Sequence, residues 1–136
     1  MLIGFEHVGT TSRNLDRTIA FYCDLLGLRL VLRKPQTTGE LAFLDAGGGM
    51  LEVFAPAAEI SPAREVPPEE AGMRHVTFAV TELDEMIARL ETAGVSIIER
   101  PRPAHNTELI KRVAFVRDPD GIIVELIERA EGRASI

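Results

Sequence analysis

The chain has 136 residues, of which 46% are hydrophobic and 26% charged, an ordinary composition for one soluble globular domain. Its formal net charge of -6 argues against nucleic acid or an anionic membrane as a partner, because those surfaces are usually bound by basic patches. No run reaches the roughly 18 apolar residues of a membrane span, the N-terminus lacks the layout of a signal peptide, and the single cysteine, Cys23, fits a cytoplasmic protein without an internal disulfide.

The first half of the chain predicts a strand, a helix and three further strands. A short apolar run around His7 indicates the first strand. Asn14 is placed to cap a helix, and Gly27 is placed to end it. The apolar stripe of this helix consists of Leu15, Ile19, Tyr22 and Leu26. The strand-like runs that follow are residues 28–33, 40–45 and 50–55.

The second half repeats this order after a proline-rich linker, residues 55–72, in which a long helix or a central strand is excluded. Residues 74–80 alternate with a period of two, which predicts a strand. Thr81 and Asp84 have the spacing of a capping box at a helix start, and Gly94 is a natural stop. The helix stripe consists of Leu83, Met86, Ile87 and Leu90. The last strand-like runs are residues 95–100, 110–116 and 122–128.

The two halves align as copies of one βαβββ unit. The alignment pairs His7 with His75, Leu15 with Leu83, Asp16 with Asp84, Ile19 with Ile87, Phe43 with Phe115 and Glu52 with Glu125. This order of strands and helices predicts an α+β fold. We expect a single domain, residues 1–136, made of two repeats at about residues 1–58 and 72–130 and joined by the linker.

Two histidines and two glutamates stand at equivalent positions of the repeats. His7 and His75 lie in the first strands, and Glu52 and Glu125 lie in the middle of the last strands. A buried carboxylate without a partner costs on the order of several kcal/mol. Any one of the four alone is more often a solvent-facing or satisfied residue, so the evidence is the equivalence of all four. Two imidazoles and two carboxylates predict a site for one divalent metal ion, with Ni, Co or Zn expected and Mn or Fe as alternatives.

Several segments make nearly the whole chain resemble the vicinal oxygen chelate superfamily: "EHVG", "LDRTIAFYCDLLGL", "RHVTFAV" and "VAFVRDPDGIIVELIE". That superfamily includes glyoxalase I, methylmalonyl-CoA epimerase, extradiol dioxygenases, and fosfomycin and bleomycin resistance proteins. The resemblance implies a cup-like curved sheet around a metal held by His7, Glu52, His75 and Glu125. It also implies a homodimer, in which each site is either shared between two chains or built from one chain.

The His-Glu-His-Glu quartet looks most like that of bacterial glyoxalase I, a lactoylglutathione lyase. This resemblance implies a metal-dependent lyase or isomerase, in which Glu125 moves a proton next to a metal-bound carbonyl by way of an enediolate, with Glu52 as its counterpart. It also implies that Lys111 and Arg112 bind the substrate, a 2-oxoaldehyde–glutathione adduct. Alternatively, these two basic side chains are solvated and do not bind the substrate.

Other activities of the superfamily stay open. Thr11 stands where glyoxalase I usually has an arginine that meets glutathione, so another dicarbonyl or 2-oxoacyl substrate is an alternative. An epimerase resembling methylmalonyl-CoA epimerase, acting on an acyl-CoA-like substrate, is the main rival, although Thr38 replaces an acid common in that family. An extradiol-type dioxygenase would leave Glu52 as a surplus ligand. A resistance protein that binds a drug without chemistry would not need the quartet.

Overall fold

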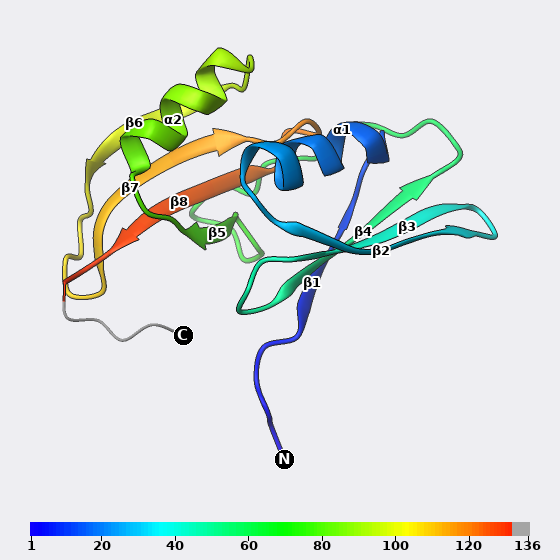
Figure 1. Cartoon of the computed structure of the whole chain (residues 1–136), viewed down its shortest axis with the longest axis horizontal. Helices are drawn as coiled ribbons and strands as arrows, with labels where there is room; N and C mark the ends of the chain where they lie inside the picture. The colour runs from blue at the N-terminus through cyan, green and yellow to red at the C-terminus, as the bar shows by residue number, and fades with distance from the viewer. Residues whose placement is uncertain (132–136) are drawn as a thin grey trace. The chain divides into compact units, whose positions relative to one another are not determined.

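The computed structural model describes residues 1–131 and divides into two compact units (Figure 1). Unit 1 runs from Met1 to Pro62, and unit 2 begins at Ala63. Each unit is a four-stranded sheet with a helical segment packed on one face. Among the residues described, no helix is long and apolar enough to cross a membrane.

Unit 1 places its first and last strands side by side. Its elements are β1 (His7–Thr11), α1 (Leu15–Ile19), the π-helix η1 (Ala20–Leu25), β2 (Arg29–Gln36), β3 (Gly39–Asp45) and β4 (Met50–Pro56). The sheet order is β1-β4-β3-β2, with β1 parallel to β4 and the other pairs antiparallel. β1 is therefore an edge strand of its sheet, and its only strand neighbour within unit 1 is β4.

Unit 2 has the same topology. Its elements are β5 (Val76–Ala79), α2 (Leu83–Thr92), β6 (Ile97–Pro103), β7 (Ile110–Arg117) and β8 (Ile123–Arg129). The sheet order is β5-β8-β7-β6, with β5 parallel to β8 and again at an edge. The predicted α+β fold with two βαβββ units is confirmed.

The last strand of each unit presents its acid on the face opposite the helix. In β4, Leu51 and Val53 are buried toward the core, so the intervening Glu52 points the other way. In β8, Val124 and Leu126 are fully buried and alternate with Glu125 in the same manner. The strands therefore combine a packed inner face with one carboxylate on the open face, which explains an acid inside an apolar run.

The first helix of the chain widens after one turn. From Ala20 to Leu25 its backbone is a π-helix, whose extra residue per turn changes which side chains face the sheet. Adjacent Phe21 and Tyr22 are both buried, with ring centroids 4.8 Å apart in an edge-to-face arrangement. Ile19 and Leu26, which a regular helix would bury, are only half-buried.

Most predicted helix ends are confirmed, and one is wrong. The Asn14 side chain accepts a hydrogen bond at the start of α1, and Gly27 and Gly94 follow the two helices with φ of 95° and 83°. The prediction of Thr81 as the second N-cap is wrong. The cap position of α2 is Glu82, in the left-handed region with φ of 52°, and it makes no side-chain capping bond. An unusual backbone conformation therefore replaces the extended N-cap that the motif assumes.

The second part of the proline-rich linker packs onto unit 2. The backbone N–H of Ala63 donates to the carbonyl oxygen of Asp120 at 3.0 Å. The carboxylate of Glu65 accepts from the guanidinium of Arg117 at 3.3 Å. The boundary between the units therefore lies directly after Pro62, inside the predicted linker.

Candidate functional site

His7 and Glu52 come together on the open face of unit 1. Gly9 pairs with Glu52 across β1 and β4, and His7 lies two residues earlier on the same face. A Cβ added at Gly9 would lie 3.6 Å from Glu52 Oε1, so the carboxylate extends over the glycine. The His7 ring packs edge-on against Phe43, with centroids 5.5 Å apart. Its Nδ1 lies 3.4 Å from Glu6 Oε1.

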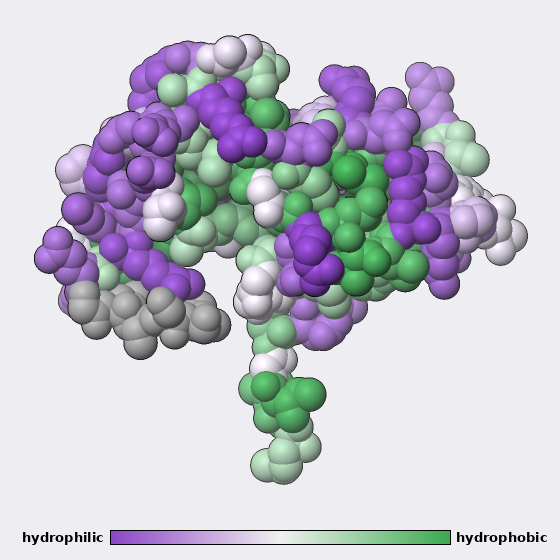
Figure 2. Space-filling model, viewed as in Figure 1, coloured by the Kyte–Doolittle hydropathy of each residue, from purple (hydrophilic) through white to green (hydrophobic). Residues whose placement is uncertain are grey.

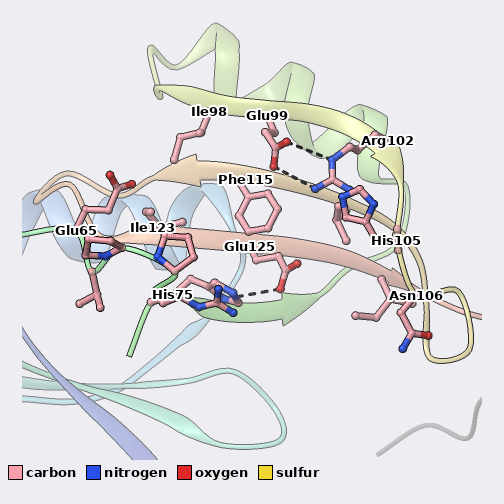
Figure 3. Close-up of a pocket in the computed structure, with 17 residues that line it drawn as sticks. Glu65, His75, Ile98, Glu99, Arg102, His105, Asn106, Phe115, Ile123 and Glu125 are labelled. Atoms are coloured by element: carbon pink, nitrogen blue, oxygen red, sulfur yellow. Dashed lines mark hydrogen bonds and ion pairs between the residues drawn. The ribbon is translucent and has the colours of Figure 1, made fainter. Parts of the chain in front are cut away.

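His75 and Glu125 form the equivalent pair on the open face of unit 2 (Figure 3). Thr77 pairs with Glu125 across β5 and β8, and the His75 ring packs edge-on against Phe115 at 5.7 Å. The Thr77 hydroxyl donates to Glu125 Oε1 at 2.7 Å and lies 3.0 Å from His75 Nδ1. The direct distance from His75 Nδ1 to Glu125 Oε1 is 3.8 Å, too long for a hydrogen bond. The threonine therefore links the two.

Each unit thus offers one imidazole and one carboxylate beside an aromatic ring. Within residues 1–131, neither unit gathers three or more histidine, cysteine, aspartate or glutamate side chains able to hold a metal ion. A four-ligand centre would need both pairs. The quartet as one metal site stays a prediction.

The donors in both pairs suit a borderline divalent cation. The Nδ1 atoms of His7 and His75 each face an oxygen, which leaves the Nε2 atoms for a metal. Side-chain exposure is 34% for His7, 28% for His75 and 13% for Glu125, so these groups are partly shielded yet still accessible. Imidazole and carboxylate together match Ni, Co, Zn, Mn or Fe better than a purely oxygen-seeking ion.

A pocket of about 580 Å³ opens beside His75 and Glu125 in unit 2 (Figure 3). Its apolar wall includes Val66, Ile98, Ile110, Val113, Phe115 and Ile123. Arg74, Arg102 and His105 also line it. His105 belongs to this wall, although its place among Pro101 and Pro103 predicts an ordinary loop residue. No repeat partner marked it, because the loop between β6 and β7 has no counterpart of equal length in unit 1.

Most fixed charges of the pocket are neutralised locally. The guanidinium of Arg102 donates to both carboxylate oxygens of Glu99, at 3.3 and 3.2 Å. Glu65 is paired with Arg117 outside the pocket lining. Arg74 forms no ion pair with another described residue and is the remaining fixed positive charge beside the pair of His75 and Glu125.

Arg112 and Lys111 lie away from this pocket. Arg112 donates to both carboxylate oxygens of Asp84 at 2.9 Å and to Glu128 at 3.1 Å. The hydrogen bond from Arg112 lowers the pKa of the Asp84 carboxyl, although its desolvation acts in the opposite direction. Lys111 is exposed, and neither residue lines the pocket. Their role in substrate binding stays a prediction.

Cys23 has the properties expected of an inert thiol. It is half-buried in η1, and burial, followed by the nearby Asp24 carboxylate, raises its pKa. A raised pKa disfavours the nucleophilic thiolate.

The fold agrees with comparisons to known proteins. Residues 4–126 match the model of the Glyoxalase/Bleomycin resistance protein/Dioxygenase superfamily, and the chain belongs to this family. YaeR, an uncharacterized protein of Escherichia coli K12, is 34% identical over 129 residues, which cover 91% of this chain and 95% of YaeR. A probable lactoylglutathione lyase of Synechocystis is 30% identical over 118 residues, covering 85% of this chain and 87% of that protein.

A solved structure supports the same assignment. The crystal structure of SMU.1112c has a TM-score of 0.78 and 26% sequence identity, and the match covers 94% of this chain and all of that one (100%). The predicted membership of the vicinal oxygen chelate superfamily is therefore confirmed.

Proposed function

We propose that the protein is a metal-dependent lyase or isomerase of a small molecule, with an activity resembling that of lactoylglutathione lyase. The observation that carries the proposal is the equivalence of the two His-Glu pairs, His7 with Glu52 and His75 with Glu125. Relatives named lactoylglutathione lyase or probable lactoylglutathione lyase, at 28% and 30% identity, support the reaction class.

The four paired side chains would hold one divalent metal ion, with Ni, Co or Zn expected and Mn or Fe as alternatives. When bound, such an ion supplies Lewis-acid polarisation of a substrate carbonyl, which makes an adjacent C–H bond more acidic. His7 and His75 would supply imidazole nitrogen ligands, and the carboxylates of Glu52 and Glu125 would balance the charge of the cation.

The proton is moved by the carboxylates. Glu125 lies next to the pocket and is 13% exposed, so it is our candidate for the group that removes the proton and returns it to the neighbouring carbon. Phe115 and Ile123 line the pocket beside it, and their apolar surface reduces competition from water. Glu52 is the counterpart in unit 1.

The substrate is a small molecule, either a 2-oxoaldehyde–glutathione adduct or an acyl-CoA-like compound, bound in a cytoplasmic protein. The pocket volume and its apolar wall support a compact substrate body. Lys111 and Arg112 remain candidates for contacts outside this pocket.

Epimerisation is the second candidate. It needs one group that removes a proton and another that delivers it to the other side of the same carbon. The presence of two equivalent carboxylates, Glu52 and Glu125, favours this chemistry as well. The two reactions share their first step and differ in where the proton is returned.

The test combines metal analysis with turnover. We expect purified full-length protein to contain a divalent metal and to convert methylglyoxal with glutathione. Deuterium exchange into a 2-methylacyl-CoA without that conversion would favour the epimerase.

Glu125→Gln should lower kcat by about 10²–10⁴-fold, the usual contribution of a general base. Glu99→Gln is the matched control, because Glu99 lines the same pocket but is paired with Arg102. Absence of divalent metal, or full turnover by Glu125→Gln, would contradict the proposal.

A homodimer is part of the proposal. Hydrophobic side chains reach the surface over the sheet of unit 1 (Figure 2), and Leu30, Val31 and Leu32 of β2 are 43%, 47% and 42% exposed. Apolar surface of this kind is typical of contact surfaces between proteins. It supports association of two chains, as the family resemblance implies.

A further inference from the structure

Thr77 stands between the two proposed metal ligands of unit 2. Its hydroxyl has one proton, and that proton is donated to Glu125 Oε1 at 2.7 Å. An ionised carboxylate can only accept, so the hydrogen bond cannot run the other way. The Thr77 oxygen is therefore left to accept from His75 Nδ1, 3.0 Å away. This places the proton of neutral His75 on Nδ1 and leaves the Nε2 lone pair open.

The equivalent position in unit 1 has no hydroxyl. Gly9 pairs with Glu52 as Thr77 pairs with Glu125, and both stand two residues after their histidine. At Gly9, a side chain as small as a methyl group would already contact Glu52 Oε1 at 3.6 Å. His7 Nδ1 instead faces Glu6, whose side chain is 72% exposed and lies at the longer distance of 3.4 Å. The two His-Glu pairs, called half-sites below, thus have the same ligand types. They differ in the neighbouring groups that hold the histidine and the glutamate in place.

We propose that Thr77 is a positioning residue, which fixes the Nδ1–H tautomer of His75 and anchors one oxygen of Glu125, so that unit 2 carries the more rigid half of the metal site. The proposal rests on the proposed function for the identity of the ligands. The hydrogen-bond chain itself is independent of any metal. Neighbours that hold ligating histidines and carboxylates commonly alter metal affinity by about 10–100-fold.

The restraint has a physical consequence for binding. His75 and Glu125 lose less conformational freedom on meeting the ion when they are already oriented, and this makes binding tighter. Because Thr77 is solvent-exposed, its hydrogen bonds contribute little to folding. Removing the hydroxyl should therefore change ligand orientation without unfolding unit 2.

The first experiment reads the tautomer in metal-free, full-length protein by two-bond ¹H–¹⁵N correlation spectra of the histidine rings, at a pH where His75 is neutral. We expect Nδ1–H for His75 in the wild type and a shift toward Nε2–H in Thr77→Val, which keeps the β-branched shape. Thr77→Ser, which keeps the hydroxyl, should retain the wild-type tautomer. An unchanged tautomer in Thr77→Val, or the same shift in Thr77→Ser, would overturn the proposal.

The second experiment measures the affinity for Ni²⁺ and Zn²⁺ by competition with a chromophoric chelator. We expect Thr77→Val to bind about 10–100-fold more weakly and Thr77→Ser to stay close to the wild type. Thr11→Val is the matched control, since it removes an exposed hydroxyl from β1 that has no link to either pair. Equal losses in Thr11→Val and Thr77→Val, or no loss in Thr77→Val, would overturn the role of Thr77. If the wild-type protein binds neither ion, the proposed function is contradicted. The first experiment would still show whether Thr77 fixes the tautomer of His75.

Discussion

At the scale of single residues, repeat equivalence identified the two pairs but not their surroundings. His7 with Glu52 and His75 with Glu125 were predicted because identical residues recurred in matching strands, and strand pairing then brings each pair together. Thr77 was not predicted because the equivalent position in unit 1, Gly9, has no side chain that could be matched with it. Part of the pocket wall was equally hidden, since Val66 and His105 come from the linker and a loop that the repeats do not share.

The Asp84–Arg112 pair gives a pH-dependent prediction. Arg112 lowers the pKa of Asp84 in the folded protein, so the pair stabilises the fold above the ordinary carboxyl pKa of about 4, and this contribution is lost as the pH falls through the lower folded value. Asp84→Asn should therefore reduce the free energy of unfolding at pH 7 by a small amount, because the Asp84 carboxylate is exposed to solvent. Urea unfolding at pH 7 and in strong acid measures the difference.

The control for this prediction is Glu85→Gln, which removes the same charge from the same first turn of α2, where the described residues provide no ion pair for Glu85. Both variants lose the same interaction with the helix dipole. We expect the extra loss in Asp84→Asn to vanish in strong acid, and an extra loss that persisted there would show that it does not come from the charge of Asp84.

At the scale of elements, strand order and apolar periodicity predicted nearly every helix and strand. The failures arose where backbone geometry departs from the regular forms that periodicity assumes. In the π-helix η1, Phe21 is buried although the predicted stripe does not include it, while Ile19 and Leu26 are only half-buried. At α2 the left-handed Glu82 displaces the cap by one residue from Thr81. The prediction that the two units form one domain remains a prediction.

The hairpin of β3 and β4 yields a steric prediction at Gly39. A Cβ there would overlap the carbonyl oxygen of Ala55 and lie 2.8 Å from Pro56 Cα, both backbone atoms that cannot swing aside. Gly39→Ala should destabilise unit 1 by about 1–3 kcal/mol, as overpacking does. Gly9→Ala, whose Cβ would meet only a side-chain oxygen at 3.6 Å, is the control and should leave stability nearly unchanged. Thermal unfolding of both variants measures this difference. Equal melting temperatures for Gly39→Ala and Gly9→Ala would contradict the steric argument.

At the scale of the whole molecule, the origin of the two half-sites can be tested by mixing variants. One variant carries His7→Ala and Glu52→Ala, and the other carries His75→Ala and Glu125→Ala. If the site is shared between chains, a mixed dimer regains one complete set of four ligands. If each chain builds its own site, the mixture has none.

In the shared arrangement, one of the two that the family resemblance leaves open, the mixture should recover part of the metal content and turnover after the two variants are unfolded and refolded together. Each variant refolded alone is the control. If mass measurements demonstrate mixed dimers but neither metal content nor turnover recovers, each site is built from a single chain.

Both proposed half-sites involve strands at the edges of their sheets, β1 in unit 1 and β5 in unit 2. An edge strand has backbone groups that no neighbour within its own sheet satisfies. Metal binding by the proposed ligands would add to the stability of the folded protein by mass action. A chelator should then lower its melting temperature, so metal supply would govern how long the protein stays folded as well as its chemistry.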